Sequence, residues 1–177
     1  MKVQILAAIS ATLFLLNCPA ASAKVVEGWD VFPGEKHCAM YSEFSGGTSV
    51  GFSWYPAKQE TRVTLINENW DSLRSRHGEK VRLDLKVFGD NVEYDEWWSD
   101  NAIIIALEDE SESITAHWGE EYALEFATAI ALGEGLQIKA DGRTVGQFSL
   151  DGTYAAMLEL RRCGAQVLQS IDDPFAG

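Results

Sequence analysis

Residues 81–87 alternate between apolar and charged side chains, and this pattern constrains the fold more than any other feature of the chain. The apolar members are Val81, Leu83, Leu85 and Val87, and the charged members are Arg82, Asp84 and Lys86. Successive side chains of a β-strand point to opposite faces. The spacing therefore predicts a strand with one face in the core and the other in water. Half-buried strands of this kind are typical of antiparallel sheets.

Weaker alternation recurs earlier in the chain, in residues 49–54 and 61–65. Glycine and asparagine tolerate the positive φ angles of tight hairpins, so clusters of these residues predict turns between strands. Such turns are expected at Gly46-Gly47, Gly89-Asp90-Asn91 and Asp141-Gly142. Residues 102–107, Ala-Ile-Ile-Ile-Ala-Leu, do not alternate and predict a strand that is covered on both faces.

Two segments break this pattern and predict helices. Residues 120–132 are rich in alanine, leucine and glutamate, and two glycines follow them closely. Residues 153–162 place apolar side chains on one stripe, and the final Arg161-Arg162 pair suits the negative end of a helix dipole. We therefore expect a mainly β fold, an antiparallel β-sandwich or partly open barrel, with two helices packed across or beside it.

The first 23 residues predict a cleavable secretory signal. A single lysine precedes an apolar run over residues 3–16, and small residues end the segment with the spacing that signal peptidase reads. The mature protein would work in the periplasm or outside the cell, without a transmembrane anchor. The alternative is a lipid attached at Cys18, although the residue before it is not the small one that bacterial lipoprotein signals favour.

Length and charge limit the remaining possibilities. Removing residues 1–23 leaves 154 residues, which suits one domain with its own core. We assign residues 24–169 to that β-rich domain and 170–177 to a flexible tail. The net charge is −13, and it becomes −14 without the signal, which holds one lysine and no acidic residue. This excess argues against nucleic-acid binding and favours a basic protein or a cation as the partner.

Two cysteines remain after the signal, Cys38 near the start of the domain and Cys163 near its end. An even pair in an oxidising compartment predicts a disulfide, here between an early strand and the last helix. Closing so long a loop is expected to stabilise the fold by about 4–5 kcal/mol in the chain-entropy model. A metal or catalytic-thiol role would need a CxxC motif or neighbouring ligands, and the sequence has neither.

No motif identifies a reaction, and we assign no catalytic residue, metal ligand or cofactor. His37, His77 and His117 are scattered and lack the close spacing of zinc ligands. A nucleophile elbow, a P-loop and a dinucleotide fingerprint are all missing from the sequence. One acidic cluster is a candidate for binding a cation, but its spacing does not fit an EF-hand. Its members are Asp90, Glu93, Asp95, Glu96 and Asp100.

The aromatic residues are more informative, because Trp97 and Trp98 are adjacent in a predicted strand. Their rings should leave the sheet on opposite sides. An outward indole beside Tyr94, Asp95 and Glu96 would form an aromatic and acidic patch, typical of a contact with a protein or a carbohydrate. The alternative places the second ring beneath the first predicted helix.

Several short motifs follow one another in a recognisable order. They are Trp29, Cys38-Ala39-Met40, Phe126-Ala127-x-Ala129, Leu136-x-Ile138 and Phe148-Ser149-Leu150-Asp151-Gly152-x-x-Ala155-x-x-Leu158. This order resembles the invasion-associated locus B family of small secreted or periplasmic bacterial proteins, over most of the chain after the signal. The resemblance implies a non-catalytic exported β protein, in a family sometimes linked with host-cell entry. It carries over no catalytic residue.

Two classes of function follow from these observations. The first is an exported, non-catalytic binding or interaction protein of the bacterial envelope, such as an inhibitor or adaptor that docks on a basic protein. The net charge and residues 94–98 motivate it. The alternative is a secreted hydrolase that uses carboxylates or an assembled metal site on a β-sandwich. That alternative predicts a pocket that gathers His77, His117 or several acidic groups with perturbed pKa values.

Overall fold

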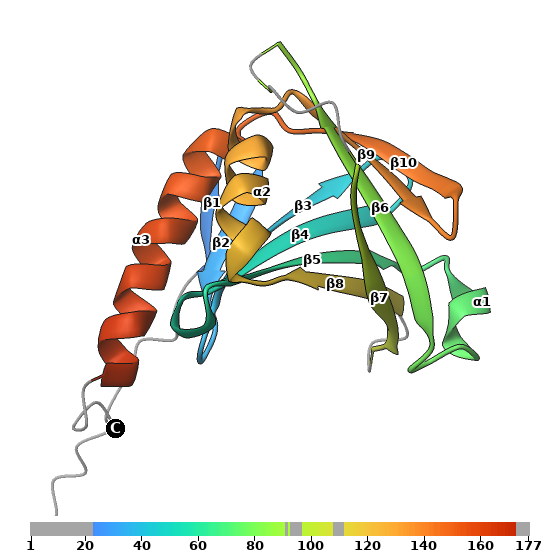
Figure 1. Ribbon diagram of the computed structural model, residues 1–177, viewed down its shortest axis with the longest axis horizontal. Coiled ribbons are helices and arrows are strands. Elements are labelled where there is room, and N and C mark those ends of the chain that lie inside the picture. The colour runs from blue at the N-terminus through green and yellow to red at the C-terminus, as the bar shows by residue number, and fades with distance from the viewer. Residues whose placement is uncertain (1–22, 91, 93–96, 108–111, 173–177) are drawn as a thin grey trace, which may run out of the picture.

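A computed structural model of the chain describes residues 23–90, 92, 97–107 and 112–172. Its strands form one ten-stranded sheet in the order β1-β2-β3-β4-β5-β8-β7-β6-β9-β10, and the paired neighbours are antiparallel. The sheet curls strongly, so that its second half passes over its first (Figure 1). The mainly β, antiparallel fold expected from the alternating segments is confirmed.

The strands of the first half lie side by side in chain order. They are β1 (Lys24–Val26), β2 (Trp29–Pro33), β3 (Cys38–Phe44), β4 (Thr48–Tyr55) and β5 (Glu60–Asn67). The strands of the second half are β6 (Lys80–Phe88), β7 (Trp98–Ala106), β8 (Glu112–Trp118), β9 (Gly135–Ala140) and β10 (Arg143–Ser149). The helical elements are a short 3-10 turn η1 (Pro56–Lys58), α1 (Asp71–Arg74), α2 (Glu120–Leu132) and α3 (Thr153–Asp172). The predicted helix over 120–132 is thus confirmed.

The predicted hairpins agree with the pairing of the strands. Gly46-Gly47 joins β3 to β4, and Asp141-Gly142 joins β9 to β10. Both residues of the second turn have positive φ, 48° at Asp141 and 75° at Gly142, as a tight hairpin requires. β6 and β7 are antiparallel neighbours, although residues 91 and 93–96 of their connection lie outside the described residues.

β6 shows how the alternation builds the core. The four apolar side chains of residues 81–87 are buried, while the charged residues between them face outward. Leu85 lies opposite Trp98 of β7 and Ile138 of β9, so the inner face is continuous across three strands. The prediction that residues 102–107 are covered on both faces is wrong. Ile103 is 42% exposed, because α2 and α3 cover only the inner face of the sheet.

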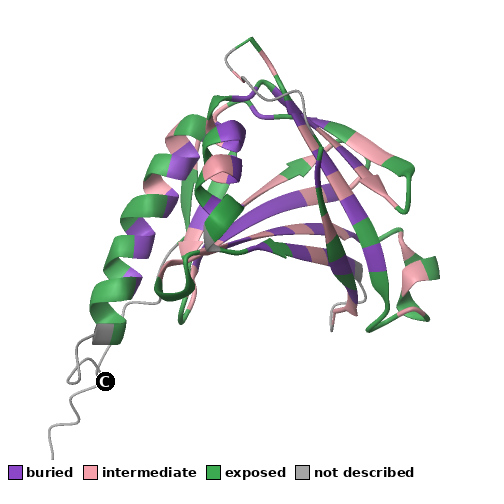
Figure 2. Ribbon diagram, viewed as in Figure 1, coloured by how far each residue is buried: buried purple, intermediate pink, exposed green. Residues whose placement is uncertain are grey.

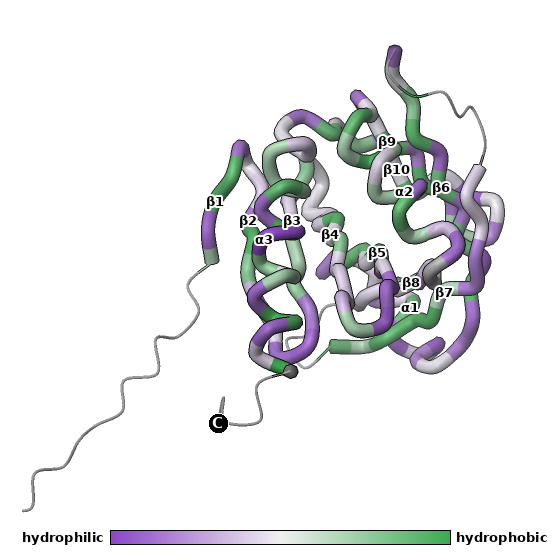
Figure 3. Tube along the Cα trace, turned by 60° about the vertical axis from the view of Figure 1, so that its left-hand side comes forward, coloured by the Kyte–Doolittle hydropathy of each residue, from purple (hydrophilic) through white to green (hydrophobic). Residues whose placement is uncertain are grey.

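The helices α2 and α3 close one side of the curled sheet, and their buried residues face it (Figure 2). Phe126 of α2 lies at the centre of this contact. Its ring stacks on that of Trp118 of β8 at 4.8 Å and meets that of Trp98 edge-on at 5.7 Å. The longer α3 runs beside β2 and β3, as the turned view in Figure 3 also shows. The core therefore fills the space between both helices and the sheet.

The helix α3 is longer than the predicted segment over 153–162. Its apolar stripe continues through Cys163 and Val167, and it includes residues 170–172 of the predicted flexible tail. Arg161 and Arg162 do not end the helix: both are exposed, and Arg162 pairs with Glu159 one turn earlier at 3.1 Å. Residues 173–177 lie outside the described residues.

The predicted disulfide between Cys38 and Cys163 is confirmed. It joins the first residue of β3 to the middle of α3, with the two Cα atoms 6.0 Å apart. Both cysteines are buried, so the bond belongs to the core that α3 forms with the sheet.

Residues 1–22 lie outside the described residues, and so the structure does not test the predicted secretory signal. Within the described ranges, no helix combines the length and the apolar character needed to cross a membrane.

Contacts across the curl hold the two halves of the sheet together. Phe148 of β10 meets Phe44 of β3 edge-on at 5.0 Å. Nearby, the indole Nε1 of Trp29 donates a hydrogen bond of 3.0 Å to the carbonyl oxygen of Asp151, just before α3. These contacts fix β10 over the ends of the early strands. At the other end, away from α2 and α3, the tip of the β9–β10 hairpin stands opposite α1 (Figure 1).

Candidate functional site

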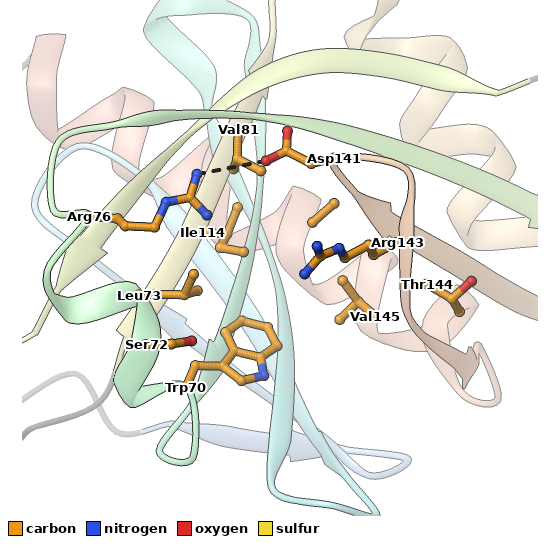
Figure 4. A pocket seen from close by; sticks show the side chains of 11 residues that line it. Trp70, Ser72, Leu73, Arg76, Val81, Ile114, Asp141, Arg143, Thr144 and Val145 are labelled. Atoms are coloured by element: carbon orange, nitrogen blue, oxygen red, sulfur yellow. Dashed lines mark ion pairs between the residues drawn. The ribbon is translucent and has the colours of Figure 1, made fainter.

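A pocket of about 470 Å³ opens between α1 and the tip of the β9–β10 hairpin (Figure 4). Its apolar lining consists of Trp70, Leu73, Val81, Ile114, Ala140 and Val145. Its polar lining consists of Ser72, Arg76, Asp141, Arg143 and Thr144. An apolar floor with a few converging polar groups is the usual composition of a site for a small molecule. We refer to this space as the mouth pocket.

The wall that carries Trp70 is held by the buried side chain of Asn67, the last residue of β5. Its amide nitrogen donates to the hydroxyl of Thr48 at 2.8 Å and to the carbonyl oxygen of Gly46 at 3.2 Å. Its carboxamide oxygen accepts a hydrogen bond from the backbone of Asn69 at 2.7 Å. The chain therefore leaves β5 in a fixed direction, which places Trp70 at the start of α1 and against the edge of the core.

The opposite wall is fixed by a reciprocal contact between the β9–β10 turn and β6. Asp141 donates its backbone N–H to the carbonyl oxygen of Arg82 at 2.8 Å. Its side-chain Oδ1 accepts the backbone N–H of Arg82 at 3.0 Å. Because the turn is anchored at Asp141, the next strand begins at a defined place and brings Arg143, Thr144 and Val145 to the pocket.

The charges at the pocket are not equivalent. Arg76 pairs with Glu79, Nε to Oε2, at 2.8 Å, and with Asp141 across the opening at 3.7 Å. The hydrogen bond to Glu79 is the main reason why the pKa of Arg76 is raised. Arg143 makes no ion pair with any other described residue, and Figure 4 shows its guanidinium pointing into the pocket, toward the side of Ile114 and Trp70. The one unneutralised charge of the pocket is therefore positive.

The sequence-predicted patch lies elsewhere on the molecule. Trp98, the first residue of β7, is buried beneath α2, whereas Trp97, which precedes the strand, is 37% exposed. The ammonium group of Lys139 lies 4.3 Å from the centre of the Trp97 ring. Tyr94, Asp95 and Glu96, the other members of the predicted patch, lie outside the described residues.

The histidines do not meet at the pocket. His37 stacks on Tyr55 with ring centres 4.8 Å apart, and His77 accepts a hydrogen bond from the backbone N–H of Ala106 at 3.0 Å. His117 is exposed on the outer face of β8, between the inward residues Ala116 and Trp118. The described residues therefore do not gather His77 and His117 in one pocket, which is one of the arrangements that the hydrolase alternative predicts.

The acidic cluster is only partly described. Asp90 and Asp100 lie within the described ranges, and Glu93, Asp95 and Glu96 lie outside them. Among the described side chains, no group of three or more histidine, cysteine, aspartate or glutamate residues is placed to hold a metal ion. At the mouth pocket the carboxylate of Asp141 is already occupied by Arg76 and by a backbone N–H.

Sequence reasoning missed the mouth pocket. The Asp141-Gly142 turn marked the hairpin, but nothing in the sequence singled out Trp70 or Arg143. The pocket forms only because the sheet curls until the segments of these two residues, about 70 residues apart in the chain, face each other. Alternation reports which face of a strand is buried and not how far a sheet bends.

Comparison with protein-family models, with curated proteins and with solved structures finds no match. The function must therefore be argued from the site itself, since a fold alone does not determine a function.

Proposed function

We propose that this protein is an exported, non-catalytic binding protein of the bacterial envelope, and that it binds its ligand in the mouth pocket. The pocket carries the proposal: its volume of about 470 Å³ lies within the usual range for small-molecule sites, and its apolar floor is open to solvent. A binding role needs only these features. The hydrolase alternative would also need free carboxylates or a metal site at the pocket, and the one carboxylate of the described lining, that of Asp141, is already paired with Arg76.

Export is part of the proposal and rests on two observations. Residues 1–23 have the composition of a secretory signal. The Cys38–Cys163 disulfide is of the kind that persists in an oxidising compartment such as the periplasm. The resemblance to the invasion-associated locus B family agrees with an exported protein without catalytic residues, and membership of that family belongs to the proposal as well.

Binding of an uncharged apolar probe tests the role of the pocket. N-phenyl-1-naphthylamine fluoresces strongly only in apolar surroundings, so its emission should rise when it is titrated with the protein. Val145→Trp should suppress this rise, because Val145 lies beside Arg143 on the pocket side of β10 and a bulky ring there would fill the space (Figure 4). Gln147→Trp is the matched control: it adds the same ring to an exposed position of the same strand, outside the pocket lining.

The control distinguishes binding of the probe in the mouth pocket from its non-specific adsorption to the protein surface. Wild type and Gln147→Trp should bind the probe equally, and Val145→Trp should bind it at least about tenfold more weakly, which corresponds to about 1.4 kcal/mol. The same emission for all three proteins would contradict binding in the mouth pocket. Circular dichroism should confirm that both variants keep the wild-type fold.

A second candidate function is docking on a basic protein, as an inhibitor or adaptor. The acidic excess favours it, because an opposite charge speeds association and selects the partner. The exposed indole of Trp97 offers an apolar anchor of the type enriched at interfaces. This role and the mouth pocket involve different parts of the surface and do not exclude each other.

Affinity capture from envelope extract tests the second candidate. The mature protein, residues 24–177, should retain a basic protein at low salt and release it at high salt. Trp97→Ala should weaken the capture at both salt concentrations. Capture that is independent of salt, or unaffected by Trp97→Ala, would count against docking of a basic partner at this surface.

A further inference from the structure

Arg143 sets the charge of the mouth pocket. The other cation of the lining, Arg76, is held by Glu79 at 2.8 Å and by Asp141 at 3.7 Å. Asp141, the acidic residue of the lining, is satisfied by that pair and by the backbone of Arg82. Arg143 has no ion-pair partner among the described residues. A ligand in the pocket therefore meets one available guanidinium and no available carboxylate.

The walls of the pocket select the rest of the ligand. Trp70, Leu73 and Val145 present apolar surface at the opening, and Val81 and Ile114 close the floor. Figure 4 shows the guanidinium of Arg143 beside this surface rather than beyond it. One molecule could thus place an apolar group on the floor and an anionic group against Arg143.

We propose that the ligand of the mouth pocket is a small organic acid, with one carboxylate that pairs with Arg143 and a flat apolar body that packs against Trp70. This inference rests on the proposed function of the pocket. A carboxylate matches the planar guanidinium, since the two groups can form a pair of parallel hydrogen bonds. A cationic ligand would meet an unneutralised positive charge, and a fully apolar ligand would leave Arg143 without a partner.

The net charge of the whole chain, −13, opposes the approach of an anion. This opposition is weak at the pocket, because salt screens exposed charges beyond about 8 Å at physiological ionic strength. Contact with Arg143 is much shorter than that distance, so the local guanidinium decides which ligand is preferred. The long-range charge instead lowers the rate at which the anion arrives.

A pair of probes of equal shape and different charge tests the inference. Isothermal titration calorimetry would compare 2-naphthoate with its neutral amide, 2-naphthamide, on the full-length mature protein. We expect wild type to bind the naphthoate at least about tenfold more tightly than the amide, as a charge-assisted hydrogen bond predicts. Arg143→Gln should remove this preference by weakening only the naphthoate. Arg143→Lys should keep part of it, because the charge remains and the planar fork is lost.

Arg161→Gln is the matched control, since it removes an equal charge from the exposed face of α3, far from the pocket lining. It should leave both affinities unchanged. A loss of naphthoate binding equal to that in Arg143→Gln would assign the preference to net charge and overturn the inference.

Failure of the inference can be told apart from failure of the proposed function. If wild type binds both probes equally and Val145→Trp abolishes both, the pocket binds apolar molecules and the carboxylate pairing is wrong. If neither probe binds, or if Val145→Trp changes nothing, the proposed function of the pocket fails and this inference fails with it.

Discussion

The indole of Trp54 lies against the backbone of Gly164, so closely that a Cβ on residue 164 would stand 2.7 Å from Cδ1 of the ring. Trp54 is also the residue of β4 that lies directly opposite Cys38 of β3. The contact with Gly164 and the Cys38–Cys163 disulfide therefore hold α3 to the sheet at the same point. The absence of a side chain at residue 164 allows the helix to approach this closely.

Gly164→Ala should destabilise the protein. In the interior of a free helix this substitution would raise the free energy of unfolding by up to about 1 kcal/mol. Here the added methyl group collides with the Trp54 ring, and overpacking of this kind costs about 1–3 kcal/mol. Urea unfolding followed by circular dichroism would measure the net change. A gain in stability would contradict the contact.

A double-mutant cycle identifies the cause. In a Trp54→Ala background the collision is gone. The effect of Gly164→Ala on the free energy of unfolding should then change sign, and the substitution should stabilise the protein by up to about 1 kcal/mol. If the loss persists without the Trp54 ring, then the substitution acts through some other contact of α3.

Two buried threonines should respond oppositely to replacement by valine. The hydroxyl of Thr61 in β5 is buried and has no hydrogen-bond partner within the described part of the chain. Thr61→Val removes this unpaired group and should leave stability unchanged or raise it by up to about 1 kcal/mol. The matched control, Thr48→Val, removes an acceptor that the Asn67 amide contacts at 2.8 Å, and should cost about 1–2 kcal/mol. Chemical denaturation of both variants checks the prediction, and equal losses would contradict it.

The adjacent tryptophans should differ sharply in their contribution to stability. Trp98 packs edge-on against Phe126 at 5.7 Å in the core, so Trp98→Ala should cost about 3–5 kcal/mol. Trp97 is 37% exposed and lies under the ammonium group of Lys139, so Trp97→Ala should cost less than about 1 kcal/mol. Thermal unfolding of both variants would test this difference. A large loss of stability in Trp97→Ala would mean that the Trp97 ring is buried.

The sequence was most informative where one local pattern determines the structure. The alternation in residues 81–87 is realised as β6, and the composition of residues 120–132 as α2, with the predicted bounds of that helix. The pairing of Cys38 with Cys163 followed from counting the cysteines that remain after the predicted secretory signal. In each of these cases the deciding information lies within one segment of the sequence or in the number of cysteines.

Prediction failed where the deciding contact is distant in the chain. The helix predicted over residues 153–162 continues in α3 through Gly164, which lies against Trp54, more than one hundred residues earlier in the chain. The apolar run predicts a buried Ile103, yet this side chain is 42% exposed on the outer face of β7. The mouth pocket could not be predicted for the same reason: Trp70 and Arg143 lie in distant segments, and only the curl of the whole sheet brings them to one pocket.

The stability of the fold should depend on pH through His37. Burial is the main cause that lowers the pKa of this imidazole below 6.5, and the nearby charge of Arg62 lowers it further. The unfolded chain then binds more protons than the folded one as the pH falls below about 6.5, so the free energy of unfolding should fall with it. His37→Gln should flatten this part of the profile. An NMR titration of His37 measures the folded pKa itself, and Arg62→Gln should shift it upward. A folded pKa at or above 6.5 would contradict the burial of His37 against Tyr55.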